Sequence, residues 1–176
     1  FNDNLIDKIW NRSISRAKNK FYTLPDTSVG ESYISKINKI LSKLKKVKAD
    51  FQLITASENN AWLFNIRGND SKYTPIPYSY SLIDKMGNII FFCDLKKITT
   101  SFKKNFKKIK FVDINYIHTV LSKIYRKKII IDKNTCSIYY ENIILKNNKV
   151  LSQLDSIYTL KAIKTKKEIA NIKKAH

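Results

Sequence analysis

Three residues near the middle of the chain have types and a spacing suited to chemistry: Arg67, Gly68 and Asp70. They follow an apolar run at 61–64 and precede Pro75, which indicates a buried segment that ends at a glycine corner and continues as an extended strand. A guanidinium and a carboxylate three residues apart can form a charge-assisted pair across such a corner. The simplest interpretation is an Arg–Asp pair that braces the corner.

Metal-assisted hydrolysis requires other residues, and the sequence offers few of them. Two dications need about five to six protein ligands from clustered carboxylates and histidines. The chain has two histidines, His118 and His176, and its acidic residues are scattered. It contains no HExxH motif, no cysteine-rich zinc pattern and no GxSxG nucleophile motif. We therefore predict no catalytic residue, no metal ligand and no cofactor in this chain.

The formal net charge of +20 is the most prominent feature of the composition. Such a charge is typical of proteins that bind nucleic acid or anionic membranes. The 34 basic residues are almost all lysines, whereas nucleic-acid binders use arginine for bidentate contacts to phosphate and guanine. Solvated lysine faces are therefore the preferred interpretation, with nucleic-acid binding as the alternative. No apolar run approaches the roughly 18–20 residues of a membrane span.

The two cysteines, Cys93 and Cys136, lie far apart in the sequence and lack CxxC spacing. Two free buried thiols in a reducing compartment are the preferred interpretation, with a disulfide as the alternative. The cysteine usage thus favours a cytoplasmic protein.

The apolar periodicity predicts one α/β domain with a mixed β-sheet flanked by helices on both sides. A helix is expected from Ser28 or Gly30 to Lys46, with Ile34 and other apolar residues on one face and a solvated face of lysines 36, 39, 43, 45 and 46. The apolar run at 89–93 predicts a strand covered on both faces. The other expected strands are 51–55, 109–112 and 128–131, and 78–84 forms a hairpin with 88–94. The other expected helices are 4–10, 57–63, 98–106, 116–124, 135–141, 151–159 and 165–176.

Four segments, in the same order along the chain, resemble one protein family. The corner segment AWLFNIRG, followed by Asp70, Pro75 and a final Ser-Tyr, is similar to the AWLLNLRGSD…NP.F.SY segment of Xaa-Pro aminopeptidases (aminopeptidase P). Thr74 and Pro77 depart from that pattern, which has asparagine and an aromatic residue there. The other segments are VGES at 29–32 with Lys36-Ile37, DFQLITA at 50–56, and KAIK with EIANIKKAH at 161–176.

The resemblance implies the middle domain, the second creatinase/prolidase N-terminal-like domain, of a three-domain Xaa-Pro aminopeptidase, with a ribonuclease-H-like fold. It implies a connector at 1–28, the domain proper at 29–160, and at 161–176 a linker with the first helix of a catalytic domain. The family's metal ligands lie downstream of His176. The parent is thus expected to be a hydrolase that uses two divalent metals, manganese, to remove the residue before proline, while this chain is a non-catalytic accessory domain.

The same resemblance makes Arg67, Asp70 and Lys161 candidate contacts to the substrate cleft or to a neighbouring domain, with a solvated linker lysine as the alternative at 161. The expected partners are the parent's catalytic domain, a second subunit and, through the parent, a peptide with proline at its second position. Neither a membrane nor nucleic acid is an expected partner. Two alternative functions stay open: a basic ribonuclease-H-like module that binds nucleic acid, and a protein-binding domain of a catalytically dead creatinase homologue.

Overall fold

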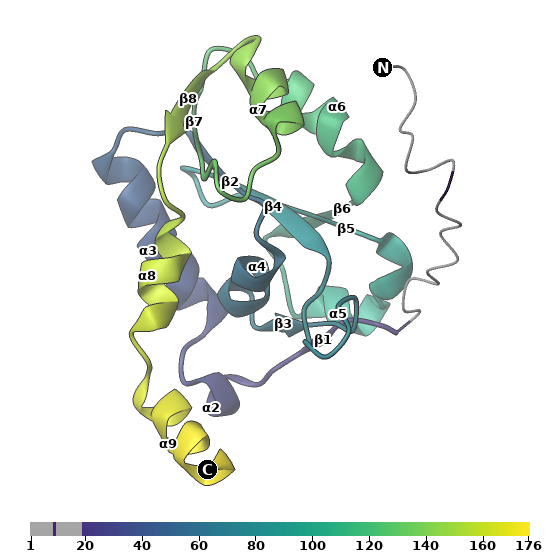
Figure 1. Ribbon diagram of the computed structural model, residues 1–176, viewed down its shortest axis with the longest axis vertical. Helices are drawn as coiled ribbons and strands as arrows, with labels where there is room; N and C mark the ends of the chain where they lie inside the picture. The colour runs from purple at the N-terminus through teal and green to yellow at the C-terminus, as the bar shows by residue number, and fades with distance from the viewer. Residues whose placement is uncertain (1–8, 10–18) are drawn as a thin grey trace.

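The structure is a computed structural model that describes residue 9 and residues 19–176. Its centre is a six-stranded sheet (Figure 1). The strands, in spatial order, are β6 (Ile109–Asp113), β5 (Ile89–Cys93), β4 (Ser79–Asp84), β2 (Phe51–Ile54), β7 (Lys128–Ile131) and β8 (Lys149–Ser152). β4 runs antiparallel to both of its neighbours, whereas the β5–β6, β2–β7 and β7–β8 pairs are parallel. The sheet is therefore mixed, as predicted.

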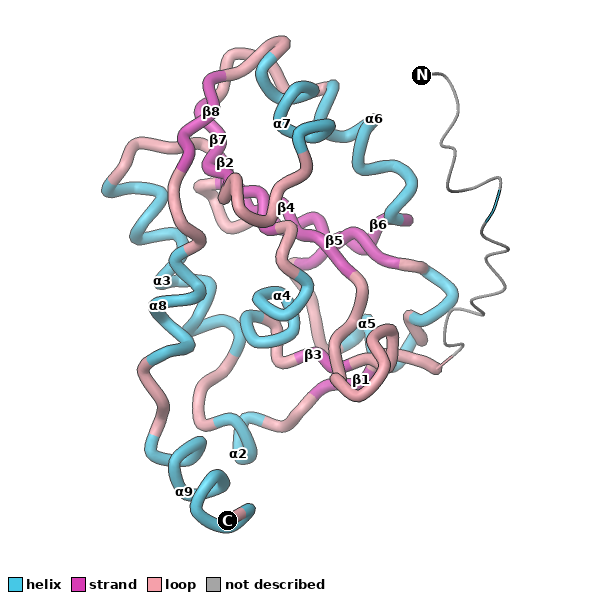
Figure 2. Tube along the Cα trace, viewed as in Figure 1, coloured by secondary structure: helices cyan, strands magenta, loops and turns pink. Residues whose placement is uncertain are grey.

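Helices cover both faces of this sheet (Figure 2). One face carries α3 (Tyr33–Lys46), α4 (Ser57–Leu63), α5 (Thr100–Lys104) and α8 (Ser156–Ala162), and the other carries α6 (Ile117–Ser122) and α7 (Ile138–Leu145). Successive residues of a strand point to opposite faces, so Phe91 packs in the first core and Phe92 in the second. Both rings are fully buried. The prediction that 89–93 is covered on both faces is confirmed.

A smaller sheet and a helix pair lie at one end of the molecule. β1 (Tyr22–Thr23) pairs antiparallel with β3 (Ile66–Arg67), and α2 (Asp26–Val29) packs against α9 (Lys166–Ala175). Phe21, just before β1, is buried in the first core, and its ring lies against Gly68. Apart from residue 9, the helix expected at 4–10 and the first part of the expected connector lie outside the described residues.

The main amphipathic helix begins later and faces the core differently from the prediction. Gly30 ends α2 with a left-handed backbone (φ +78°), and the Ser32 side chain caps α3 by accepting a hydrogen bond from the Ser35 amide. The expected start at Ser28 or Gly30 is therefore wrong. Lys36 is buried and Ile34 is exposed, so the expected solvated face is wrong at 36 and the expected apolar face is wrong at 34.

The C-terminal third contains a strand where a helix was expected. Residues 149–152 form β8, parallel to β7, and the Asp155 side chain then caps α8. The helix predicted at 151–159 is therefore wrong in its first half. The helix predicted at 135–141 begins only after the Ser137 cap, as α7, and the one predicted at 98–106 is the shorter α5, capped by Thr99. Two 3₁₀ turns, η1 (Leu95–Lys97) and η2 (Ile114–Tyr116), complete the described elements.

Candidate interdomain site

The predicted corner comprises the end of α4, the short strand β3 and Gly68, which follows β3. Asn65 takes a left-handed backbone (φ +55°), a conformation that asparagine tolerates better than most residues. Gly68 follows, and a Cβ at this position would lie 2.9 Å from the ring of Phe21 and 3.0 Å from Cα of Pro77. Close packing therefore requires glycine at 68. The corner is a tightly packed support rather than a flexible loop.

Arg67 points back to α4. Its Nη1 donates hydrogen bonds to the carbonyl oxygens of Ala61, at 2.8 Å, and Ile66, at 2.9 Å. Ala61 lies in the last turn of α4, where carbonyl groups lack helical partners and a nearby cation is favourable. Burial lowers the pKa of the guanidinium. Arg67 thus stabilises the end of α4, and the predicted Arg67–Asp70 pair is wrong because Nη1 of the guanidinium binds two backbone carbonyl oxygens, one of them in α4.

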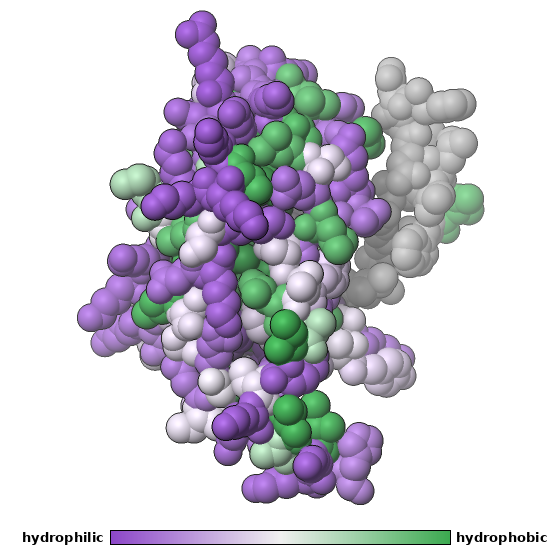
Figure 3. All heavy atoms as spheres, turned by 90° about the vertical axis from the view of Figure 1, so that its left-hand side faces the viewer, coloured by the Kyte–Doolittle hydropathy of each residue, from purple (hydrophilic) through white to green (hydrophobic). Residues whose placement is uncertain are grey.

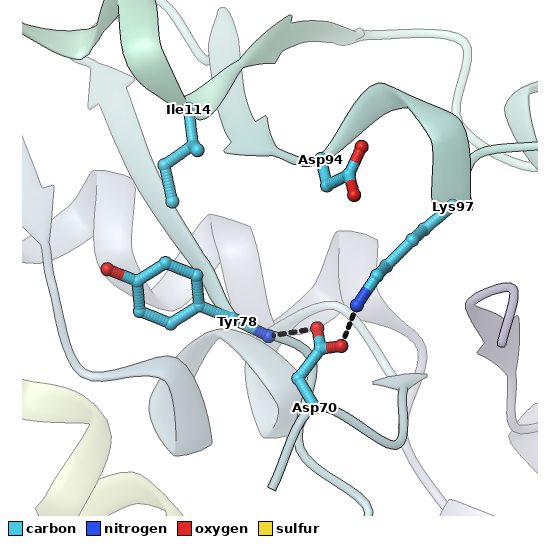
Figure 4. Close-up of a pocket in the computed structure, with 5 residues that line it drawn as sticks. All are labelled: Asp70, Tyr78, Asp94, Lys97 and Ile114. Carbon is cyan, nitrogen blue, oxygen red and sulfur yellow. Dashed lines mark hydrogen bonds and ion pairs between the residues drawn. The ribbon is translucent and has the colours of Figure 1, made fainter. Parts of the chain in front are cut away.

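Asp70 pairs instead with Lys97, the last residue of η1. Lys97 Nζ donates to Oδ1 of Asp70, and the Tyr78 amide donates to Oδ2 at 2.8 Å (Figure 4). The Lys97 and Asp70 side chains are only 5% and 10% exposed, so the pair is largely removed from water. Asp94 and Ile114 complete the lining of a cavity of about 210 Å³ beside the pair. This volume is below the roughly 300 Å³ of small-molecule pockets, and it suits a single side chain.

Lys36 is a buried cation beside the corner that sequence reasoning missed. Its Nζ donates to the carbonyl oxygen of Trp62 at 2.7 Å and to Oδ1 of Asn65 at 2.6 Å, and it lies 4.0 Å from the centre of the Trp62 ring. Desolvation lowers the pKa of this ammonium to about 8, although Glu31 opposes the shift. Lys36 thereby ties α3 to the end of α4. The available signal was its position one turn before Ile40, on the buried side of the helix.

Lys161, from α8, also contacts α4. Its Nζ donates to Oδ1 of Asn59 at 2.8 Å and lies over the Tyr158 ring at 4.7 Å. The Asn59 amide donates to Oδ2 of Asp155 at 2.7 Å, and Nε2 of Gln52 donates to Oδ1 of the same Asp155 at 3.0 Å. Burial raises the pKa of Asp155. This polar network attaches α8 to α4 and β2.

The three candidate residues therefore do not form one cluster. Arg67 and Lys161 both bind α4, at Ala61 and Asn59 respectively, whereas Asp70 is held by Lys97. Each makes its contacts within the domain. The shared element is α4, which supports both the corner and α8.

α9 lies on α2 and exposes part of its apolar face. Oγ1 of Thr165, which caps α9, donates to the carbonyl oxygen of Val29 at 3.2 Å, and the Asn171 amide donates to the carbonyl oxygen of Ser28 at 2.7 Å. Two isoleucines of α9 stay nearly half exposed, Ile169 at 43% and Ile172 at 46%. Figure 3 shows apolar side chains at this end of the molecule, next to hydrophilic ones, and further apolar patches higher on the same face. This apolar surface is suited to packing against another domain.

The titratable groups of the described residues do not fit a dinuclear metal centre. Within that part of the chain, no three His, Cys, Asp or Glu side chains are grouped closely enough to hold a metal ion, so no step of metal chemistry is assigned to them. Cys93 and Cys136 are free and buried, and burial raises the pKa of their thiols to about 12 and about 11. The preferred prediction of two free buried thiols is confirmed. None of the described helices combines the length and apolarity needed to cross a membrane.

The family model described as "Creatinase/Prolidase N-terminal domain" matches residues 12–168. The chain belongs to this family. The family predicted from the corner motif and the three other segments is thus confirmed, and so is the predicted fold class.

Full-length relatives of this creatinase/prolidase N-terminal domain are peptidases by name. The chain is 28% identical to "Probable Xaa-Pro aminopeptidase P" of Laccaria bicolor, with 99% of the chain and 28% of the relative covered. It is 30% identical to "Xaa-Pro aminopeptidase ApepP" of Drosophila melanogaster, with 98% of the chain and 29% of the relative covered. The chain therefore spans less than a third of the length of these curated relatives.

Solved structures share the fold of this creatinase/prolidase N-terminal domain. An X-prolyl aminopeptidase from Caenorhabditis elegans, described as a cytosolic enzyme with a di-nuclear active site, matches with a TM-score of 0.86 at 24% identity, over 99% of this chain and 29% of that one. The prolidase from Pyrococcus horikoshii OT3 matches with a TM-score of 0.57 at 19% identity, over 80% of this chain and 39% of that one. At these identities the likeness establishes the fold alone.

Proposed function

We propose that this domain is a non-catalytic accessory domain of a metal-dependent Xaa-Pro aminopeptidase. The observation that supports this proposal is the coverage: 98–99% of the chain aligns with Xaa-Pro aminopeptidases, but it accounts for only 28–29% of their length. The parent enzyme is a hydrolase that removes the N-terminal residue from peptides with proline at the second position. Its two divalent metals, manganese in this proposal, are bound by residues outside this chain. The cytosolic relative from Caenorhabditis elegans supports a cytoplasmic location.

In this proposal the domain packs against the catalytic domain and helps to restrict the substrate cleft. Residues 1–28 are the connector, 29–160 are the domain proper, and 161–176 lead into the catalytic domain. Three features support this assignment of roles: the apolar surface of α9, the small cavity beside Asp70, and Lys161 on the helix that precedes α9. The first two offer a contact that another domain or a second subunit can complete, whereas Lys161, bound to Asn59, holds α8 in place.

The test is the rate of Xaa-Pro peptide hydrolysis by this chain, measured beside the full-length gene product, both with added manganese. We expect no Xaa-Pro hydrolysis by this chain and measurable hydrolysis by the full-length protein. Activity of the purified chain itself would overturn the accessory role, because another site would then have to exist. A full-length protein that is silent but folded would overturn the peptidase assignment and would favour the catalytically dead, protein-binding homologue.

A further inference from the structure

A groove runs along one flank of α3, where the helix faces the β4–β5 turn. It consists of two adjoining hollows of about 460 Å³ and 620 Å³, which share the lining residues Asn38, Leu41 and Met86. The first hollow begins at Tyr33 and the second extends past Lys45. At about 1.5 Å per helical residue, this stretch of α3 is about 18 Å long. We call this feature the α3 groove.

Apolar side chains line the centre of the α3 groove. Ile37 and Ile89 form a buried floor, while Ile34 and Met86 remain 57% and 78% exposed. Methionine adapts its shape to different binding partners and is common at such surfaces. Ile34 on α3 and Met86 on the β4–β5 turn both line the hollow that begins at Tyr33, so a bound apolar side chain can contact both.

Lysines surround both ends of the α3 groove. The described lining residues include one acidic side chain, Asp50, and this carboxylate is already paired with Lys85 at 2.8 Å. The exposed lysines are Lys45, Lys48 and Lys85 at one end and Lys104, Lys107 and Lys108 at the other. The charge of the groove is therefore complementary to carboxylates at both ends of a ligand.

We propose that the α3 groove binds an acidic amphipathic helix of a partner protein. The groove is long and straight because it follows a helix, and about 18 Å corresponds to rather more than three helical turns. A helix that docks in this way places apolar anchors at i, i+3 or i+4, and i+7 in the groove. Its acidic residues then meet the lysines at the two ends. A second copy of this chain is a poor occupant, since each copy carries a net charge of +20.

The probe is a synthetic, fluorescein-labelled helix of leucine, alanine and glutamate, with the leucines on one face. Binding to the chain is measured by fluorescence anisotropy at about 0.15 M ionic strength. A peptide of the same composition in scrambled order, without an apolar face, is the first control. We expect the amphipathic peptide to bind and the scrambled peptide to bind at least about tenfold more weakly.

Variants then locate the binding site. Met86→Glu changes an exposed side chain, so the fold is expected to persist while peptide affinity falls about tenfold. Reversing three lysines at one end of the groove is expected to weaken binding at least as much. The matched control reverses the charge of three exposed lysines outside the groove. It changes the net charge by the same amount and should leave most of the affinity for the peptide. The groove variant is K104E/K107E/K108E and the control variant is K127E/K146E/K149E.

Three results would overturn the proposal. Equal binding of the scrambled peptide, or equal losses in the two triple variants, would show attraction to the overall positive charge only. A dimer detected by sedimentation and abolished by Met86→Glu would identify a second copy of the chain as the occupant.

Discussion

We expect Lys36→Met to abolish a rise in stability that the wild-type chain shows between about pH 8 and 10.5. In the unfolded chain the lysine keeps its ordinary pKa of 10.5, whereas in the folded domain desolvation lowers the pKa to about 8. Between these two values the unfolded state binds the proton and the folded state does not. Raising the pH therefore favours folding, and below pH 8 the folded domain bears the full cost of the buried charge.

The size of the effect follows from the two pKa values. The difference between 10.5 and about 8, at about 1.4 kcal/mol per pKa unit, corresponds to about 3 kcal/mol. Methionine removes the charge, but it leaves the carbonyl oxygen of Trp62 and Oδ1 of Asn65 without this donor, at about 1–3 kcal/mol each. At pH 7 these two changes oppose each other. From pH 7.5 to 10.5 the stability of the wild type relative to the variant should grow by about 3 kcal/mol.

The assay is urea unfolding followed by tryptophan fluorescence at a series of pH values. The free energy of unfolding of the variant is subtracted from that of the wild type at each pH, so that titrations common to both cancel. Lys46→Met is the matched control, because it makes the same substitution at an exposed position of α3. The reasoning is refuted if the two variants give the same pH profile, or if the wild type loses stability relative to Lys36→Met as the pH rises.

Three further predictions concern the corner and the core. Asp70→Asn should lower the free energy of unfolding by about 3 kcal/mol, because it leaves a desolvated Lys97 opposite a neutral amide. Gly68→Ala should cost about 1–3 kcal/mol in the same assay, because its Cβ collides with the ring of Phe21. The buried thiol of Cys93, whose pKa is raised to about 12, should react with a disulfide reagent at pH 8 only after unfolding in urea.

Each has its own check. Lys85→Met breaks the Lys85–Asp50 pair, in which the lysine side chain is 57% exposed, and should cost less than about 1 kcal/mol; an equal cost for Asp70→Asn would contradict the desolvated pair. Phe21→Leu should recover part of the Gly68→Ala loss, and simple additivity of the two changes would argue against the collision. Native reaction of Cys93 as fast as in urea would contradict its burial.

The central strands could be predicted from the sequence because local pattern and tertiary position agree there. A continuous apolar strand such as 89–93 must be buried on both faces at any position in the sheet, and the glycine between it and the preceding strand indicates a hairpin. β8 shows the opposite case. Leu151, Leu154 and Ile157 have helical spacing, but Lys149–Ser152 pairs with β7, about twenty residues earlier in the chain. A pairing of that kind leaves little local signal.

The candidate site was also predicted only in part, because its local features leave a signal in the sequence and its long-range contacts do not. The corner itself could be predicted from an apolar run followed by a glycine and a proline. The structure shows that close packing requires glycine at position 68. The sequence does not predict which residues bind the charged side chains of the corner. Arg67 and Asp70 are three residues apart, and this short separation suggested that they pair with each other. The actual partner of Asp70 is Lys97, 27 residues along the chain. Burial of Lys36 was likewise hidden, because lysines also hold three of the six exposed positions of α3, at 39, 45 and 46.

The contacts of α4 bear on how Arg67 and Lys161 would act in the proposed enzyme. Arg67 holds the last turn of α4, and Lys161 binds Asn59 in the first turn of the same helix. α9 is held separately, by Thr165 and Asn171 on the segment around α2. If a catalytic domain continues from α9, its orientation relative to this domain is therefore fixed by two sets of contacts. These are the contact of α8 with α4 and the contacts of α9 with the segment around α2. In the enzyme proposed above, Lys161 and Arg67 would therefore affect a substrate cleft only through the positions of α4 and α8, and neither would need to touch the peptide.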